Sequence, residues 1–194
     1  MRFLVSSILT FILSVIPITP TLAQSAVSQH VSKSGAQYKL LRHNNLFFEI
    51  EIPADWSHKE TVRGFGQVLV LHPSTTDPDK LTKGYKTVSL SLARFPGSTL
   101  EETRQMTVRG MTSMYKDVTL VKEKDDSTIN GNPAVSISYT RPMPSGDRFY
   151  EKITFIKAGS LTYRVSIHSV GLPTNNARRN NQKIISTFRP IPRK

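Results

Sequence analysis

Apolar and polar residues alternate over several short stretches of the chain. The clearest are residues 48–52, 87–94 and 161–167, where every second residue is apolar. A period of two is typical of a β-strand with one buried and one polar face. Pro53 ends the first of these strands, because proline has no backbone N–H to donate to a neighbouring strand. The apolar runs 65–71, 134–140 and 149–157 predict further strands.

The dipeptide Asn130-Gly131 predicts a hairpin turn. Asn-Gly between two apolar runs favours a two-residue β-hairpin, since both central residues of a type I′ turn need positive φ. We expect this turn to join a strand over 118–129 to the strand over 134–140. The connections at 142–147 and 158–160 are too short for parallel crossovers, so this region predicts an antiparallel meander.

The first of two helical segments follows Pro96-Gly97. A capping box predicts its start, either Ser98 with Glu101 or Thr99 with Glu102, because the hydroxyl can accept from a backbone N–H of the first turn. Helical spacing then continues to about residue 115. The expected buried stripe is Leu100, Thr103, Thr107, Met111 and Met114, with Met106 beside it.

The second helical segment lies near the C-terminus and is expected to start at Thr174 or Asn175. Pro190 and Pro192 follow it, and proline does not fit a helix interior. Its expected buried stripe is Ala177, Asn181, Ile184, Ile185 and Phe188. The only tryptophan, Trp56, comes just after the strand 48–52 and is expected to fill one end of the core.

The N-terminus has the features of a secretory signal peptide. Met1-Arg2 precedes an apolar stretch from Phe3 to Ile18, and small residues follow up to Ala23, after which we expect cleavage. The stretch is shorter than the ~20 residues that span a bilayer, which argues against an uncleaved anchor. We therefore divide the chain into a signal peptide (1–23), a flexible polar leader (24–45) and one domain (46–194). The leader leaves room for a short ordered piece near residues 38–41.

The chain has no cysteine and a formal net charge of +12. The lack of cysteine excludes disulfides, thiolate metal sites and thiol catalysis. A basic excess favours anionic partners, and for an exported protein we expect an acidic protein or an anionic envelope surface rather than nucleic acid. The alternative is that the charge only keeps a small domain in solution. No second apolar segment reaches spanning length, so we expect no transmembrane segment in the mature chain.

The basic excess is concentrated near the C-terminus, where no acidic residue follows Glu151. The candidate partner-binding residues are Arg178, Arg179, Lys183 and Arg189, on or just after the second helical segment. The alternative is an ordinary solvated helix face, whose cations stabilise the helix C-terminus.

No set of residues predicts a catalytic, metal or cofactor site. The five histidines include no i, i+2 or i, i+4 pair, and His168 falls on the polar side of its strand, where a surface position is expected. Met106, Met111 and Met114 could bind Cu(I), but at helical spacing they fit core packing better. No Gly-x-Ser-x-Gly motif and no phosphate-binding glycine loop occurs. We therefore expect neither an enzyme nor a cofactor.

Three stretches resemble the PsbP-like superfamily, which includes DcrB-like exported proteins. They are residues 48–56 (FEIEIPADW), the hairpin 129–134 (INGNPA) and the helix end 184–188 (IISTF). The order of elements is similar over about residues 46–190. The resemblance implies an α+β fold, an antiparallel sheet of about six to seven strands with helices packed on both faces. It also implies binding rather than catalysis.

These features predict an exported, non-catalytic protein, periplasmic or extracellular, that binds another envelope component through a basic surface. The alternative is a small-ligand or lipid-binding module with a pocket between the sheet and the methionine-rich helix. A salt-dependent interaction would favour the first function. Binding that is lost on filling the space near Met111 would favour the second.

Overall fold

The computed structural model describes residues 26–31, 37–63, 66–81, 85–93, 96–97, 99–123 and 128–192. The signal peptide expected over residues 1–23 lies outside these residues, so cleavage near Ala23 stays a prediction. Neither of the helices in the described ranges has the length and apolar character needed to cross a membrane.

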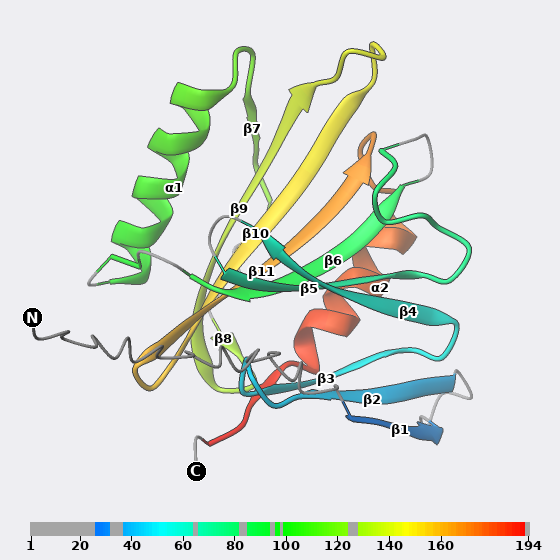
Figure 1. The fold of residues 1–194 in the computed structure, drawn as a ribbon. Coiled ribbons are helices and arrows are strands. Elements are labelled where there is room, and N and C mark those ends of the chain that lie inside the picture. Colours follow the sequence, from blue (N-terminus) through cyan, green and yellow to red (C-terminus); the bar gives the residue numbers. More distant parts are fainter. Residues whose placement is uncertain are drawn as a thin grey trace, which may run out of the picture.

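The described strands form two antiparallel sheets (Figure 1). The larger, eight-stranded sheet has the order β4-β5-β6-β11-β10-β9-β7, with β8 paired to β9. Its strands are β4 (Trp56–Arg63), β5 (Gly66–Pro73), β6 (Lys86–Leu92), β7 (Thr119–Val121), β8 (Thr128–Ile129), β9 (Asn132–Pro142), β10 (Arg148–Ala158) and β11 (Leu161–Val170). The smaller sheet has the order β1-β2-β3-β12, with β1 (Ala26–Val31), β2 (Gln37–His43), β3 (Phe48–Pro53) and β12 (Arg189–Pro190).

The turn predicted at Asn130-Gly131 is confirmed. Its φ angles are 46° and 76°, so both central residues have the positive φ that a type I′ turn requires, and β8 pairs with β9 across it. The Asn130 side chain also donates to the carbonyl oxygens of Ser186 and Phe188, at 2.8 and 2.7 Å. The hairpin therefore satisfies carbonyl groups at the C-terminal end of α2 (Asn175–Ser186).

Both helices begin at predicted caps. Thr99 is the N-cap of α1 (Leu100–Met114), and its hydroxyl accepts from the Glu102 backbone N–H at 3.0 Å. Thr174 is the N-cap of α2, and its hydroxyl accepts from the Ala177 backbone N–H at 3.2 Å. The stripe predicted for the second helical segment is confirmed, since all five of its residues are buried.

Two apolar clusters occupy the two sides of β9 and β10, because successive residues of a strand point to opposite faces. Val135 packs in one cluster with Met111 of α1. The neighbouring Ala134 packs in the other, larger cluster, which contains Ile184 of α2. Trp56 packs against this larger cluster, as expected.

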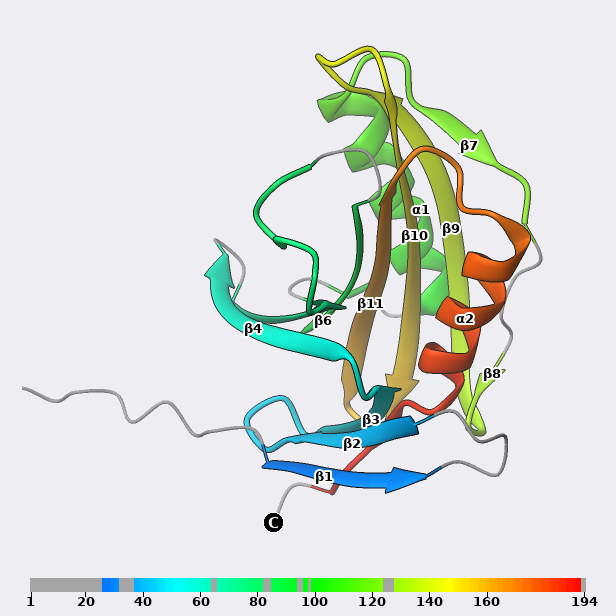
Figure 2. The same cartoon turned by 90° about the vertical axis from the view of Figure 1, so that its right-hand side faces the viewer.

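The predicted antiparallel α+β fold is confirmed, but its single sheet of six to seven strands is not. Figure 2 shows the smaller sheet lying across the lower end of the larger one. Phe48, Ile50 and Ile52 of β3 belong to the larger cluster, so a sheet as well as α2 covers this side of β9 and β10. Strand β4 was not predicted, because residues 56–63 are largely polar and show no clean alternation.

Strands β1 and β2 lie inside the range 24–45 that the composition predicts as a flexible leader. β2 pairs with β3 along its length, and Leu41 is fully buried in the larger cluster. The ordered piece expected near residues 38–41 is therefore the middle of a strand, and the folded part begins before residue 46. The sequence shows no alternation of apolar and polar residues here, because the two buried residues of β2 are a leucine and a histidine, Leu41 and His43.

Candidate functional site

Helix α1 and the larger sheet enclose a cleft with a volume of about 820 Å³. Polar residues of β6 and β11 form part of its floor, and the rim includes Pro78, Asp79 and Leu81. Helix α1 lies beside the larger sheet (Figure 1), and its buried residues are Thr103 and Met111. The volume lies within the range of about 300–1,000 Å³ that is usual for small-molecule sites.

A row of four polar residues crosses the floor of the cleft. Strand pairing places Tyr139 of β9 beside Glu151 of β10, Glu151 beside His168 of β11, and His168 beside Thr87 of β6. Directly opposite residues in antiparallel strands have Cβ atoms about 4.5–5.5 Å apart. The register thus brings Thr87 and His168, which are 81 positions apart in sequence, to a side-chain distance of 3.1 Å.

Glu151 is the centre of this row, and its side chain is only 7% exposed. The Tyr139 hydroxyl donates to Oε2, while Oε1 accepts from Arg164 Nη2 at 3.0 Å and lies 3.2 Å from His168 Nε2. Burial alone raises the pKa of Glu151, but His168, Arg164 and the Tyr139 hydroxyl together hold that pKa well below its usual range. We call Tyr139, Glu151, Arg164 and His168 the Glu151 network.

The Glu151 network presents fixed charges. Arg164 lies along β11, where its Nε donates to the Ser166 hydroxyl at 3.1 Å. Burial, and then the charge of Glu151, raise the pKa of Tyr139 far above its usual value, so the hydroxyl keeps its proton. A carboxylate with a depressed pKa is a weak base, whereas general acid–base catalysis works best with a pKa near the operating pH. Among the described residues, no group of three or more His, Asp or Glu side chains could hold a metal ion.

The mouth of the cleft carries exposed apolar side chains. Met106 is 47% and Met114 is 74% exposed, and Leu81 and Tyr115 are exposed as well. The helical spacing predicts Met114 in a buried stripe with Met106 beside it, and the structure corrects this. Met111 is buried against the sheet, whereas the other two methionines face open space because α1 borders the cleft.

One cation at the cleft lies between two aromatic rings. Arg141 Cζ is 4.8 Å from the ring centre of Tyr115 and 4.6 Å from that of Phe149. Its Nε is buried and has no hydrogen-bond partner. Aromatic faces on a guanidinium leave the N–H groups at its edge available to other partners.

Arg178, one of the predicted partner-binding residues, has an intramolecular role. Its Nη1 lies 3.2 Å from Glu123 Oε1. Glu123 also accepts from the Tyr150 hydroxyl at 2.9 Å and from the Ser138 hydroxyl at 2.7 Å. Tyr150 and Ser138 are the sequence neighbours of residues in the Glu151 network, so this second cluster lies on the opposite face of the sheet. The Arg178–Glu123 ion pair therefore ties α2 to the larger sheet.

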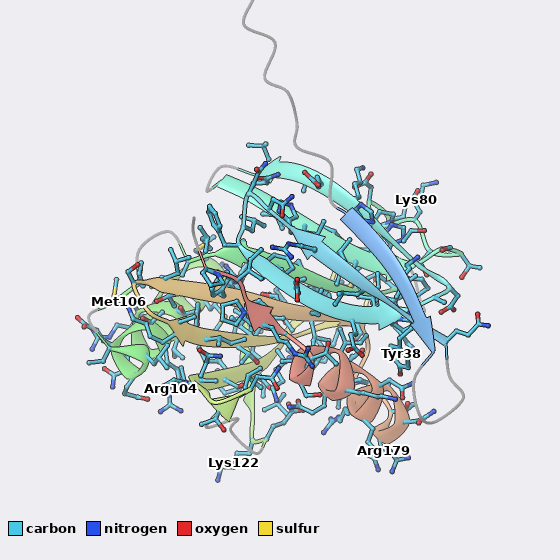
Figure 3. The ribbon with its side chains drawn as sticks, turned by 90° about the horizontal axis from the view of Figure 1, so that it is seen from below. Tyr38, Lys80, Arg104, Met106, Lys122 and Arg179 are labelled. Atoms are coloured by element: carbon cyan, nitrogen blue, oxygen red, sulfur yellow. The ribbon has the colours of Figure 1, made fainter. Side chains whose placement is uncertain are left out.

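The other predicted residues differ in their surroundings. Lys183 Nζ lies 4.4 Å from the ring centre of Tyr38, a cation–π contact between α2 and β2. Arg179 and Arg189 are exposed. Figure 3 shows Arg179 on α2, well away from Met106 of α1. The four residues therefore do not form one uniformly free basic surface.

The sequence does not reveal the Glu151 network directly. The alternation over 161–167 marks two faces of β11, and the polar face was expected at the surface, but the side chain of His168 is only 15% exposed. The available signal was Glu151 itself, an acid inside the mainly apolar run 149–157, because a buried charge needs partners. Those partners come from β9 and β11, and strand pairing has to be known before they can be named.

No protein-family model matches the chain, and no curated protein matches it. Solved structures do match. PA94 of Pseudomonas aeruginosa, a protein of unknown function, matches with a TM-score of 0.54 and 15% identity, over 80% of this chain and 99% of that chain. Cyanobacterial PsbP from Synechocystis matches with a TM-score of 0.51 and 9% identity, over 89% of this chain and 96% of that chain. The Ran-binding protein Mog1p of Saccharomyces cerevisiae matches with a TM-score of 0.50 and 13% identity, over 87% of this chain and 97% of that chain.

Identities this low show the fold alone. The chain is thus an α+β domain with the fold shared by cyanobacterial PsbP and Mog1p. The resemblance to the PsbP-like superfamily, read from three short stretches of sequence, is confirmed at the level of the fold.

Proposed function

We propose that this protein is an exported, non-catalytic binding protein whose ligand site is the cleft between α1 and the larger sheet. The observation that carries the proposal is the cleft of about 820 Å³ with exposed methionines at its mouth. Export rests on the signal-peptide pattern of residues 1–23, which would place the mature protein in the periplasm or outside the cell.

The apolar residues at the cleft favour a small apolar or amphipathic ligand. Leu81, Met106, Met114 and Tyr115 are large, exposed and line the same cleft. Apolar side chains gathered at the surface in this way are a feature of binding sites. Methionine suits such a site, because its flexible and polarizable side chain adapts to the shape of a ligand. The Glu151 network adds the few fixed polar groups that orient a ligand in an apolar pocket.

Gly110 offers a direct test of the cleft. It lines the cleft, and a Cβ added at this position meets nothing within 4 Å. Gly110→Phe is expected to fill the cleft and to lower the affinity for the neutral apolar probe N-phenyl-1-naphthylamine at least tenfold. Fluorescence titration of the wild type and the variant measures this difference.

Gly110→Ala is the matched control. It is expected to keep the probe affinity, because a methyl group leaves the cleft open, and to raise stability by up to about 1 kcal/mol, because alanine favours a helix. Equal probe binding by the wild type and Gly110→Phe would contradict the proposal, as would a wild type that binds no probe.

A basic surface that binds an acidic protein or an anionic envelope surface is the second candidate function. The net charge of +12 and the exposure of Arg179 and Arg189 favour it. One protein with this fold, Mog1p, is a Ran-binding protein, so the fold is compatible with a protein partner. In this candidate, Arg178 and Lys183 hold α2 in place, and Arg179 and Arg189 contact the partner.

Charge reversal at Arg179 and Arg189 tests this candidate without breaking the Arg178–Glu123 ion pair. The Arg179→Glu/Arg189→Glu variant is expected to bind phosphatidylglycerol vesicles at least fivefold more weakly than the wild type at low salt, in a cosedimentation assay. The Lys80→Glu/Lys116→Glu control makes the same change in net charge at two other exposed positions. An equal loss in both variants would mean that net charge, and not this surface, controls binding.

A further inference from the structure

Arg141 is a cation at the cleft with no anionic partner among the described residues. Its guanidinium lies between Tyr115 and Phe149, and its buried Nε has no hydrogen-bond partner. Arg164, the other arginine lining the cleft, is instead paired with Glu151 at 3.0 Å. Arg141 thus brings to the cleft a positive charge with no ion-pair partner among the described residues, and a bound anion would neutralise this charge.

Arg141 lies at one end of a long floor. Strand pairing places it beside Phe149, and the Glu151 network follows along β9 and β10. Val68 and Val70 of β5 line the other side of the cleft, where β5 pairs with β6. Phe149 and Phe155 of β10 both line the cleft, and their separation of six positions extends the floor over about 20 Å, at roughly 3.3 Å per residue. An anion held by Arg141 would therefore have room for an apolar chain beside it.

We propose that the cleft binds a long-chain monocarboxylate, with its carboxylate on Arg141 and its chain between the methionines of α1 and the valines of β5. This inference rests on the proposed function, which makes the cleft the ligand site. A planar guanidinium can donate two parallel N–H groups to the two oxygens of a carboxylate. The exposed side chains of Met106 and Met114 supply an apolar wall for the chain.

The charges around the cleft favour a ligand with one negative charge. Arg141 supplies one positive charge that no described carboxylate neutralises. Glu151 and Asp79 also line the cleft, but Glu151 is paired with Arg164 and Asp79 with Lys59, so neither offsets the charge of Arg141. A single positive charge matches a ligand with one negative charge, so a carboxylate fits this site better than a phosphate monoester.

Two ligands with the same chain length test the assignment. Dodecanoate and 1-dodecanol compete with N-phenyl-1-naphthylamine for the wild type at neutral pH. The wild type is expected to bind dodecanoate at least tenfold more tightly than 1-dodecanol. Arg141→Gln is expected to abolish this preference. Its affinity for 1-dodecanol is expected to stay within twofold of the wild-type value, and this retained binding also shows that the variant is folded.

Arg141→Lys is a second variant, in case Arg141→Gln does not fold. Lysine keeps a cation over the two rings but has no planar fork, so a preference of about threefold for dodecanoate is expected. An Arg141→Lys variant with the full wild-type preference would contradict pairing through a guanidinium fork.

The outcomes separate this inference from the proposed function. Equal affinities of the wild type for dodecanoate and 1-dodecanol, with both lost in Gly110→Phe, would overturn the carboxylate on Arg141 and leave the cleft as the ligand site. Tighter binding of dodecyl phosphate than of dodecanoate would overturn the choice of a monocarboxylate. Failure of both ligands and of the probe to bind the wild type would overturn the cleft itself.

Discussion

Glu151→Gln is expected to lower the free energy of unfolding at neutral pH by about 2–4 kcal/mol. The substitution removes the charge that pairs with Arg164 and His168, and an amide cannot accept from all three partners of the carboxylate. The loss stays below that of a fully buried ion pair, because the Arg164 side chain is 40% exposed and keeps part of its hydration. Urea unfolding of the wild type and Glu151→Gln measures the difference.

The stability difference between the wild type and Glu151→Gln is also expected to depend on pH. The folded protein holds the pKa of Glu151 below its ordinary value of 4.5, so the unfolded chain takes up the proton first as the pH falls. The stabilisation by Glu151 is therefore complete above about pH 4.5 and decreases below it. We expect the stability difference between the wild type and Glu151→Gln to start decreasing near pH 4.5 and to go on decreasing as the pH falls towards the pKa of the folded Glu151. A difference that is as large at pH 3 as at pH 7 would contradict the ionised role of Glu151.

Phe188→Ala is expected to destabilise the protein by about 3–5 kcal/mol, the usual effect of deleting a buried aromatic side chain. Phe188 is fully buried, and its ring centre lies 5.6 Å from that of Phe48 and 4.9 Å from that of Tyr163. It thereby joins the end of α2 to strands of both sheets. Urea unfolding followed by far-UV circular dichroism measures the loss.

Two further variants control for this effect. Phe188→Leu keeps an apolar side chain and is expected to lose less than half as much stability as Phe188→Ala. Leu172→Ala removes an exposed side chain and is expected to change stability by less than about 0.5 kcal/mol. A Phe188→Ala variant as stable as the wild type would mean that the two sheets do not share one core.

The sequence by itself determined the features that depend on a few neighbouring residues. Asn130-Gly131 predicts its turn because both residues tolerate positive φ, and Thr99 and Thr174 predict helix starts because a hydroxyl can accept from the first turn. Strict alternation located β3, β6 and β11, since the period of a strand is a local property. The three stretches that resemble PsbP-like proteins belong to the same class of local features.

Only the tertiary structure decided which faces and charges are buried. Alternation shows that β11 has two faces, but the positions of α1 and the neighbouring strands determine that His168 meets Glu151 below the cleft. Met114 has the helical spacing of a core residue, and the sequence therefore predicts that it is buried. It is exposed instead, because this side of α1 borders the cleft. The sequence predicts Arg178 as a partner-binding cation at the surface, whereas the structure pairs it with Glu123, 55 positions earlier in sequence. Each of these outcomes depends on contacts between residues far apart in the chain, which composition and period do not encode.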